Sequence, residues 1–381
     1  MSIIILLITI AYLILIGSFI IGFDRIKQFN LNDIEPETSF TVIIPFKNEA
    51  KNLPGLLKSL LNLNYPDNLF EVILVNNESD DDSVDIINNI LDTKFSQENS
   101  DRTIIKILET ERNTESPKKN AINKGVLIAK YDWIITTDAD CIVPKYWLKS
   151  FDNFIQKNNT KLLVAPVCYF GIDTYLKRFQ TLDFISLIGS TIGGFGIGKP
   201  FLCNGANMAY RKDLFVELKG FEGNMHISSG DDIFLLEKAI KQYPNDVHFL
   251  KTDLAIVKTK PQADLKSLIS QRIRWAAKTS SYKNNFGKST GLLVLIMNAS
   301  IICCLLFAFI GILSPKFLGY IFVVKISIDF LLIYKTARFL DQEDYLSTYL
   351  LSSFIYPFFS VYIATLSIFS GYKWKGNYYK K

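Results

Sequence analysis

The chain lacks the residues and motifs that identify several common classes of site. Its five cysteines show no C-x-x-C spacing and their odd number fits no complete disulfide framework, which favours reduced thiols in a cytoplasmic domain. A G-x-G-x-x-G fingerprint and a G-x-x-x-x-G-K-[ST] loop are both missing, so neither a dinucleotide-cofactor site nor a P-loop kinase site is supported. No block of Lys and Arg indicates nucleic-acid binding. The two histidines, His226 and His248, are of a type that is more often structural than catalytic.

Two long stretches contain no charged residue. They run from Ile3 to Phe23 and from Gly291 to Leu313, and about 20 apolar residues suffice to cross the hydrocarbon core of a bilayer. The first stretch could instead be a cleaved signal peptide, but it lacks a basic n-region, its apolar run is too long and no A-x-A-like site follows. We therefore expect both stretches to span a membrane.

Two less uniform stretches are also candidate spans. Residues 317–334 include Lys325 and Asp329, which are four apart and can pair on one helical turn, and residues 349–370 contain one proline. Basic residues directly after the first span predict that residues from about 30 to 285 are cytoplasmic, in a protein of the plasma or inner membrane. Four spans would leave the basic tail outside, so either the fourth stretch is re-entrant or interfacial, or one span is miscounted.

Strand-like and helix-like patterns alternate after the first span. This strand-helix-strand rhythm is typical of an α/β fold with a mostly parallel sheet. Later in the chain, five glycines between residues 189 and 198 predict a mobile loop. Strands are predicted at 40–45, 70–75, 103–108, 132–137 and 161–166, and helices at 50–61, 83–91, 121–129, 174–190, 233–242 and 264–280.

Polar clusters follow three of these strands, at Pro45–Glu49, Asn76–Ser79 and Asp138–Asp140. Ligands of parallel sheets gather at the carboxyl ends of the strands, so we expect the three clusters to converge. Asp138 and Asp140 stand at i and i+2, face one side and can hold a hard cation, Mg²⁺ or Mn²⁺, with positions left for phosphate oxygens. A solvated acidic turn explains a bare D-x-D motif more simply, and the other clusters are what favour a nucleotide-diphosphate site.

The helix predicted at 264–280 carries Gln271, Arg274 and Trp275 at i, i+3 and i+4, hence on one face. An amide, a guanidinium and an indole together suit a ligand surface better than a core. The alternative is an amphipathic helix lying on the membrane, with its tryptophan at the interface, and both interpretations can hold. The acidic pair Asp231–Asp232 opens another predicted helix, where acidic residues alone indicate only helix stability.

Taken in order, these motifs resemble those of membrane-bound family 2 glycosyltransferases, a group that includes cellulose, chitin and hyaluronan synthases and ceramide glucosyltransferase. The resemblance covers about residues 38–285. It implies a GT-A catalytic domain, Rossmann-like and flanked by transmembrane helices. It also implies inverting transfer from a nucleotide-diphosphate sugar, a UDP-sugar in the simplest case, to a membrane-associated lipid or saccharide. The implied domains are a span at 1–24, the catalytic domain at 38–285, further spans at 286–372 and a basic tail at 373–381.

The resemblance also implies roles for individual residues. One departure matters, because Asn76-Asn77 stands where the family usually has Asp-Asp. This departure leaves two points open, the identity of the nucleobase and whether the enzyme is weakened or inactive. The implied roles are nucleotide-sugar binding for Pro45, Lys47, Glu49, Asn77, Lys118 and Asp138, metal binding for Asp138 and Asp140, general base for Asp232 with Asp231 next, and acceptor or diphosphate contacts for Gln271, Arg274 and Trp275.

Three functions fit this pattern. The first is addition of a sugar to a membrane lipid or saccharide, and the small number of predicted C-terminal spans leans towards a single addition. The second is a processive polysaccharide synthase, which the Q-x-x-R-W motif favours. The third is a non-catalytic membrane protein with a degenerate nucleotide fold, which the two asparagines permit.

Overall fold

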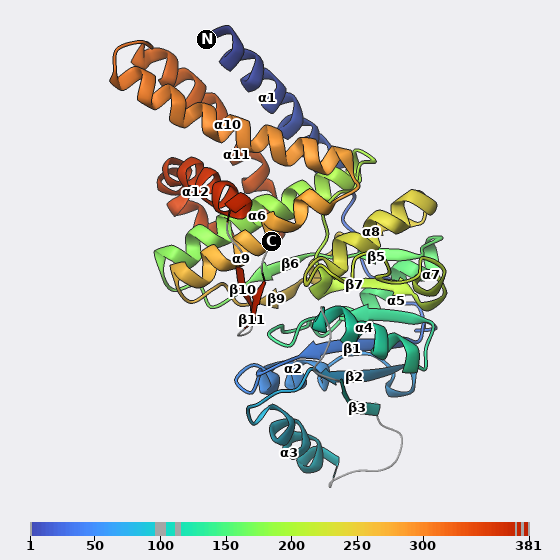
Figure 1. Cartoon of the computed structure of the whole chain (residues 1–381). Helices are drawn as coiled ribbons and strands as arrows, with labels where there is room; N and C mark the ends of the chain where they lie inside the picture. Colours follow the sequence, from blue (N-terminus) through green and yellow to red (C-terminus); the bar gives the residue numbers. More distant parts are fainter. Residues whose placement is uncertain (1, 96–103, 111–115, 370–371, 375–376, 380–381) are drawn as a thin grey trace. The chain divides into compact units, whose positions relative to one another are not determined.

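A computed structural model describes residues 2–95, 104–110, 116–369, 372–374 and 377–379 (Figure 1). The chain divides into two compact units. The sheet unit consists of Lys27–Phe170 and Cys203–Lys260, and the helical unit of Met1–Ile26, Gly171–Leu202 and Pro261–Lys381. Each unit is therefore assembled from segments that lie far apart in the sequence.

A seven-stranded sheet forms the centre of the sheet unit, with the strand order β3-β2-β1-β4-β7-β5-β8. Strands β1 to β4 run parallel to their neighbours in that group, and β7 runs antiparallel to both β4 and β5. The predicted mostly parallel α/β fold is confirmed. The strands are β1 (Phe40–Phe46), β2 (Phe70–Asn76), β3 (Ile104–Glu109), β4 (Trp133–Thr136), β5 (Leu162–Val164), β7 (Met208–Arg211) and β8 (Val247–Phe249), with β6 (Val167–Tyr169) and β9 (Val257–Thr259) paired separately.

Apolar patterning explains these elements. The central residues of β1, Val42, Ile43 and Ile44, are all fully buried, as expected for a strand covered on both faces. The four leucines of α2 recur at helical spacing and are buried, so this helix packs through one apolar stripe. The helices of the sheet unit are α2 (Leu53–Leu60), α3 (Ser83–Phe95), α4 (Pro117–Ile128), α5 (Trp147–Lys157), α7 (Lys212–Glu217) and α8 (Asp231–Gln242).

Long helices make up most of the helical unit. Among the residues that the structure describes, four helical stretches are long and apolar enough to cross a membrane: Ser2–Arg25, Asn285–Phe309, Pro315–Phe339 and Glu343–Phe369. Each of them overlaps one of the four predicted stretches, with boundaries that differ by a few residues. The elements are α1 (Ser2–Arg25), α6 (Tyr175–Gly196), α9 (Leu265–Ala277), α10 (Asn285–Phe309), α11 (Pro315–Phe339), α12 (Tyr349–Phe369) and the short strands β10 (Tyr372–Trp374) and β11 (Asn377–Tyr379).

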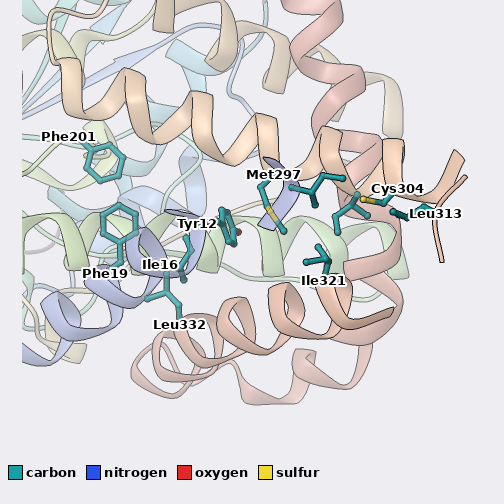
Figure 2. Close-up of a cluster of buried hydrophobic side chains, with 11 residues drawn as sticks. Tyr12, Ile16, Phe19, Phe201, Met297, Cys304, Leu313, Ile321 and Leu332 are labelled. Atoms are coloured by element: carbon teal, nitrogen blue, oxygen red, sulfur yellow. The ribbon is translucent and has the colours of Figure 1, made fainter. Parts of the chain in front are cut away.

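An apolar cluster joins the helices of this unit (Figure 2). Tyr12 and Phe19 of α1 pack there with Met297 of α10 and Leu332 of α11. The rings of Phe19 and Phe201 stack with centroids 5.5 Å apart. Side chains from the first and last parts of the chain therefore share one core.

The glycine-rich segment at 189–198 is not the mobile loop that its composition predicts, because α6 continues through it to Gly196. A Cβ atom at Gly193 would lie 2.5 Å from the carbonyl oxygen of Phe19, and one at Gly196 only 1.8 Å from that of Gly22. Small residues at such contacts let two helix backbones approach closely. These glycines are therefore packing residues between α6 and α1.

Other boundaries differ by a few residues. Strand β7 begins only at Met208, directly after a 3-10 turn at Gly205–Asn207. Residue 103 of the predicted third strand and residue 370 of the fourth span lie outside the described residues, as do 375–376 and 380–381 of the basic tail. The domain limits 1–24, 38–285, 286–372 and 373–381 stay a prediction.

Candidate active site

Three strands of the sheet unit end at one edge. Phe46, the last residue of β1, is paired in register with Asn76, the last residue of β2. Thr136, which ends β4, is paired with Ile43 of β1. The backbone N–H of Asn77 donates to the carbonyl oxygen of Phe46 at 2.8 Å. The loops that follow these strands, where the polar clusters were predicted, therefore begin side by side.

The loops after β1 and β2 are tied together by hydrogen bonds. The N–H of Asn48 donates to the Ser79 hydroxyl at 3.0 Å, and the N–H of Asp80 donates to Oδ1 of Asn48 at 2.8 Å. Asn48 and Glu78 both have left-handed backbone conformations, with φ of 54° and 52°. Such conformations persist where the surroundings hold them in place, and they are enriched at functional sites.

The predicted nucleotide-binding residues of the first loop are all partly exposed. Pro45 lies within β1, and Lys47 follows its end. Glu49 is held on both sides, since its N–H donates to the Ser83 hydroxyl at 2.9 Å and its carboxylate accepts from the Asn52 amide at 2.7 Å. The loop thus presents side chains from a backbone that is fixed at several points.

The two asparagines after β2 have different surroundings. Asn76 is buried, and its amide nitrogen donates to both carboxylate oxygens of Glu109, at 3.1 and 2.9 Å. Its Oδ1 accepts from the N–H of Ser79 at 3.0 Å. Asn77 is partly exposed, and its Oδ1 accepts from the Thr110 hydroxyl at 3.2 Å. The amide at position 76 is therefore matched to a carboxylate on the neighbouring strand.

Lys118 of α4 connects two acidic motifs. Its ammonium group lies 2.7 Å from Oδ1 of Asp138 and 3.2 Å from Oδ2 of Asp231. Burial by itself lowers the pKa of Lys118, but the carboxylates of Asp138, Asp231 and Asp232 raise it above its ordinary value. The structure therefore brings together four of the residues singled out in the sequence, from the loop after β4, from α4 and from the start of α8.

The acidic pair at the start of α8 contains one buried and one more accessible carboxylate. Asp231 is buried and takes the ion pair with Lys118. Asp232 is partly exposed, and its Oδ2 accepts from the N–H of Gly205 at 3.2 Å. Gly230, the residue before them, has a φ of 84°, a conformation that favours glycine. The more accessible carboxylate, Asp232, is the better placed to meet a substrate.

Gly205 is a site residue that the sequence analysis missed. A Cβ atom here would lie 2.9 Å from Oδ2 of Asp231 and 3.3 Å from Cβ of Asp232. The Thr136 hydroxyl donates to the Gly205 carbonyl oxygen at 2.8 Å and fixes this backbone to the end of β4. The Asn-Gly dipeptide signals a turn, whereas the close approach to the carboxylates comes from the tertiary fold.

Lys119, the neighbour of Lys118, is a second missed residue. It is fully buried, and its ammonium donates to the carbonyl oxygens of Asn224 and Ile227 at 2.7 and 2.8 Å. The same group lies 4.8 Å from the ring centroid of Phe234, within the range of a cation–π interaction. Consecutive residues of a helix point about 100° apart, so one lysine reaches the acidic cluster while the other holds the loop that leads to α8.

The fit of a metal ion depends on Asp138 and Asp140. Within the described ranges, no three His, Cys, Asp or Glu side chains are grouped so as to hold a metal ion. The two aspartates are partly exposed and offer carboxylate oxygens, which are the donors preferred by Mg²⁺ and Mn²⁺. Two carboxylates fill only part of an octahedral shell. The donor set therefore fits an ion that is bound jointly with phosphate oxygens.

The remaining predicted residues lie on α9, in the helical unit. Arg272 is the buried guanidinium there, and its Nε and Nη2 lie 2.8 and 2.7 Å from Oδ2 of Asp183 on α6. Its guanidinium carbon lies 4.2 Å from the ring centroid of Trp275, and its Nη1 donates to Oε1 of Gln271 at 2.5 Å. Gln271 and Trp275 are thus brought together around an arginine that the sequence analysis passed over, whereas Arg274 is partly exposed.

Comparison with known proteins adds several relatives. A poly-beta-1,6-N-acetyl-D-glucosamine synthase of Staphylococcus aureus strain COL is 25% identical over 277 residues, which are 69% of this chain and 61% of that protein. The synthase of the same name from Staphylococcus epidermidis is 26% identical over 186 residues, 46% of this chain and 41% of that protein. The chain therefore spans less than two thirds of the length of these relatives.

Among solved structures, the chain is similar to a mannosyltransferase from Pyrobaculum calidifontis that was solved with GDP-Man and Mn²⁺. The TM-score is 0.54 at 16% identity, and the match covers 96% of this chain and 99% of the other. At this identity the likeness concerns the fold, and it agrees with the GT-A type predicted from the motifs.

Family models match in two overlapping regions. The model described as glycosyl transferase family 2 matches residues 41–218, and the one described as glycosyl transferase family group 2 matches residues 133–368. The second region covers more than half of the chain and includes both the acidic cluster and α9. The chain therefore belongs to glycosyl transferase family group 2, as its motifs predicted.

Proposed function

We propose that this chain transfers a sugar from a nucleotide-diphosphate sugar, with UDP as the nucleotide, to a saccharide or lipid acceptor at a membrane. The observation that carries the proposal is the ion-paired cluster of Lys118, Asp138 and Asp231, with Asp232 beside it. It lies at the strand ends, where ligands of parallel sheets bind. Family membership and the likeness to polysaccharide synthases support glycosyl transfer and a saccharide acceptor.

The reaction is a single displacement at the anomeric carbon. The acceptor hydroxyl oxygen forms the new bond to that carbon while the bond from carbon to the diphosphate oxygen breaks. The nucleoside diphosphate leaves with the bonding electrons, and the hydroxyl proton passes to the Asp232 carboxylate. One displacement inverts the configuration and needs no covalent intermediate. A positioned general base contributes about 10²–10⁴ to such a rate.

The other groups of the sheet unit bind and orient the donor. Lys118 places a positive charge beside Asp138, where it can also meet the diphosphate. A divalent cation held by Asp138 and Asp140 supplies, when bound, charge neutralisation for the leaving diphosphate. The nucleoside contacts come from Pro45 in β1 and from the loops after β1 and β2, through Lys47, Glu49 and Asn77.

The acceptor side is assigned to α9, through Gln271, Arg274 and Trp275. An indole and a planar guanidinium suit a sugar ring and phosphate oxygens respectively. The four long apolar helices support an integral membrane protein. Arg25, at the end of α1, supports a cytoplasmic position for the residues that follow it.

The test is the substitution Asp232→Asn in the purified full chain, assayed with a panel of nucleotide sugars, Mn²⁺ and native membrane lipids. Transfer should fall by about 10²–10⁴ while nucleotide binding persists, because only the proton acceptor is lost. Asp253→Asn, at an exposed position of the same unit, is the control and should leave transfer unchanged. Retained transfer would move the base elsewhere, with Asp231 next. The absence of transfer and hydrolysis with every donor would favour a non-catalytic protein.

The likeness to poly-beta-1,6-N-acetyl-D-glucosamine synthases favours a second candidate within the same chemistry, processive synthesis of a polysaccharide. Single addition and processive addition differ in the length of the product. Gel electrophoresis of labelled product, together with mass spectrometry of labelled lipids, separates the two.

A further inference from the structure

The Lys118 ammonium lies between two carboxylates that come from different motifs, Asp138 at 2.7 Å and Asp231 at 3.2 Å. The three side chains differ in access to solvent, at 20% exposed for Lys118, 36% for Asp138 and 10% for Asp231. The inner partner, Asp231, is shielded, whereas the outer partner, Asp138, faces solvent. The ion pair between Lys118 and Asp231 is therefore shielded, whereas a ligand from solvent can replace the ion pair between Lys118 and Asp138.

Asp138 is at the same time one of the two carboxylates that fit a divalent cation. A cation bound there would lie close to the ammonium of Lys118, and two like charges at one carboxylate repel each other. The other fitting carboxylate, Asp140, leaves most of an octahedral shell unfilled. In the absence of nucleotide, Lys118 therefore competes with the metal ion for the same negative charge.

A diphosphate changes this balance, because it brings negative charge and several oxygen ligands. The oxygens can coordinate the metal ion and accept hydrogen bonds from a lysine ammonium at the same time. Asp138 is then released to the metal. We propose that Lys118 is an internal counter-cation that makes metal binding at Asp138 conditional on a nucleoside diphosphate. This inference rests on the proposed function for the presence of a metal ion and a nucleotide-diphosphate donor.

The proposal has a thermodynamic consequence. Metal and nucleotide each tighten the binding of the other by one common factor, because coupling between two ligands is reciprocal. Coupling in proteins typically amounts to about 5–150-fold. Without the lysine, the metal should bind more tightly to the free protein, and the added benefit from nucleotide should shrink. The remaining coupling would reflect the direct attraction between metal and diphosphate.

The experiment measures Mn²⁺ binding to the purified full chain by the electron paramagnetic resonance signal of free Mn²⁺, with and without saturating UDP. The variants are Lys118→Met, the charge-conserving Lys118→Arg and the control Lys149→Met. Lys149 pairs with the exposed Asp33 in the same unit, so its substitution changes the net charge equally. A combined Lys118→Met and Asp138→Ala variant locates the bound ion. Because all readouts are binding constants, catalytic activity is not required.

We expect Lys118→Met to bind Mn²⁺ about tenfold more tightly than the wild type in the absence of UDP, with a reduced coupling to UDP. Lys118→Arg and Lys149→Met should stay close to the wild type, and adding Asp138→Ala should abolish the gain. Unchanged or weaker Mn²⁺ binding by Lys118→Met, with the complex with UDP intact, would overturn this inference alone. Failure of the wild type to bind Mn²⁺ even with UDP would instead remove the metal from the proposed function, and the inference with it.

Discussion

The ion pairs of the two units differ in their access to solvent. In the sheet unit, Lys118 is shared between Asp138, which faces solvent, and Asp231, which is shielded. In the helical unit, Arg272 and Asp183 form a pair in which each side chain is only 7% exposed. The first arrangement can exchange partners with a ligand, whereas the second is closed. Similar residue types therefore form a partly accessible cluster in the sheet unit and a buried pair in the helical unit.

The helical unit contains a second pair of the closed kind. The Lys325 ammonium, 3% exposed, lies 2.7 Å from Oδ2 of Asp329 one turn further along α11, as their spacing predicted. The Tyr12 hydroxyl donates to the other oxygen of that carboxylate at 2.7 Å, which links α1 to α11. The Lys325 side chain is buried, and a buried ammonium group is stabilised when a carboxylate pairs with it.

The largest effect on stability should follow from removing one partner of a buried ion pair. Asp183→Leu leaves the Arg272 guanidinium buried without its carboxylate, and breaking a buried pair in this way costs about 3–5 kcal/mol. The free energy of unfolding of the purified chain, measured by chemical denaturation in detergent, should fall by that amount. The control is the double variant Asp183→Leu and Arg272→Met, in which an apolar contact replaces both charges and most of the stability should return.

A stable Asp183→Leu variant would show that the pair contributes little to the helical unit, and the contrast with the sheet unit would then disappear. A destabilised variant that the second substitution does not rescue would point to lost packing of α6 in place of an unpaired charge. We expect the unpaired charge to cause the loss of stability, because α6 has a second connection to the segment that leads into α9. The Gln180 side chain forms hydrogen bonds with both backbone groups of Gln262, at 2.9 and 3.0 Å.

Much of the fold could be predicted because local patterns suffice for it. The apolar run at 40–45 predicts a strand, and the leucines of α2 at helical spacing predict a helix; both are confirmed. The glycines at 189–198 show the limit of such patterns. Glycine indicates either a turn or a close contact, and only the presence of α1 alongside decides for the contact. Because α1 and α6 lie far apart in the sequence, local patterns could not predict this contact.

The candidate site also contains residues whose positions could be predicted from local patterns and residues whose positions could not. The approach of the three strand ends follows from parallel pairing, so the positions of Asn76 and Asp138 could be predicted from the order of elements. Gly205, Lys119 and Arg272 could not, because each is explained by a loop or helix that is remote in the sequence. Their roles depend on the space that a distant segment leaves and on the backbone groups that it presents.

An intermediate effect is expected at Lys119. This lysine is buried, like the ion pairs of the helical unit, but it lies next to Lys118 of the candidate site. Lys119→Met removes the charged donor from two partly buried carbonyl groups, and a hydrogen bond that involves a charged group contributes about 1.5–3 kcal/mol. The loop before Asp231 should loosen, so kcat should fall more than the KM of the donor rises. Lys124→Met, at a partly exposed position of the same helix, is the control.

Equal losses in Lys119→Met and in the control would mean that the loop holds its conformation without the lysine. A loss of stability with unchanged kcat would assign Lys119 to the fold alone. The comparison of kcat with the free energy of unfolding in the same preparations therefore decides whether this buried charge belongs with the closed pairs or with the site.

The smallest effect is expected where the charge is exposed, at Glu109, which accepts hydrogen bonds from the buried Asn76. Asn76→Asp replaces the amide that donates to Glu109 by a second carboxylate, at a distance of about 3 Å. The lost hydrogen bonds and the new repulsion should together cost about 1 kcal/mol, which salt should reduce because Glu109 is exposed. Repulsion also raises the pKa of the paired carboxyl groups in the folded protein, so the penalty should shrink as the pH falls and one of them is protonated.

Asn77→Asp provides the matched control for this substitution. Oδ1 of Asn77 accepts a hydrogen bond from the Thr110 hydroxyl, and a carboxylate can accept it equally well, so stability should change little. Unfolding curves of both variants at two salt concentrations and at pH 7 and 4.5 make the comparison. Equal stability of the two variants in low salt at pH 7 would show that the amide at position 76 is not needed to accommodate Glu109. A penalty confined to Asn76→Asp would explain why this chain carries an amide at position 76: with an acidic residue already opposite, a second carboxylate there would repel it.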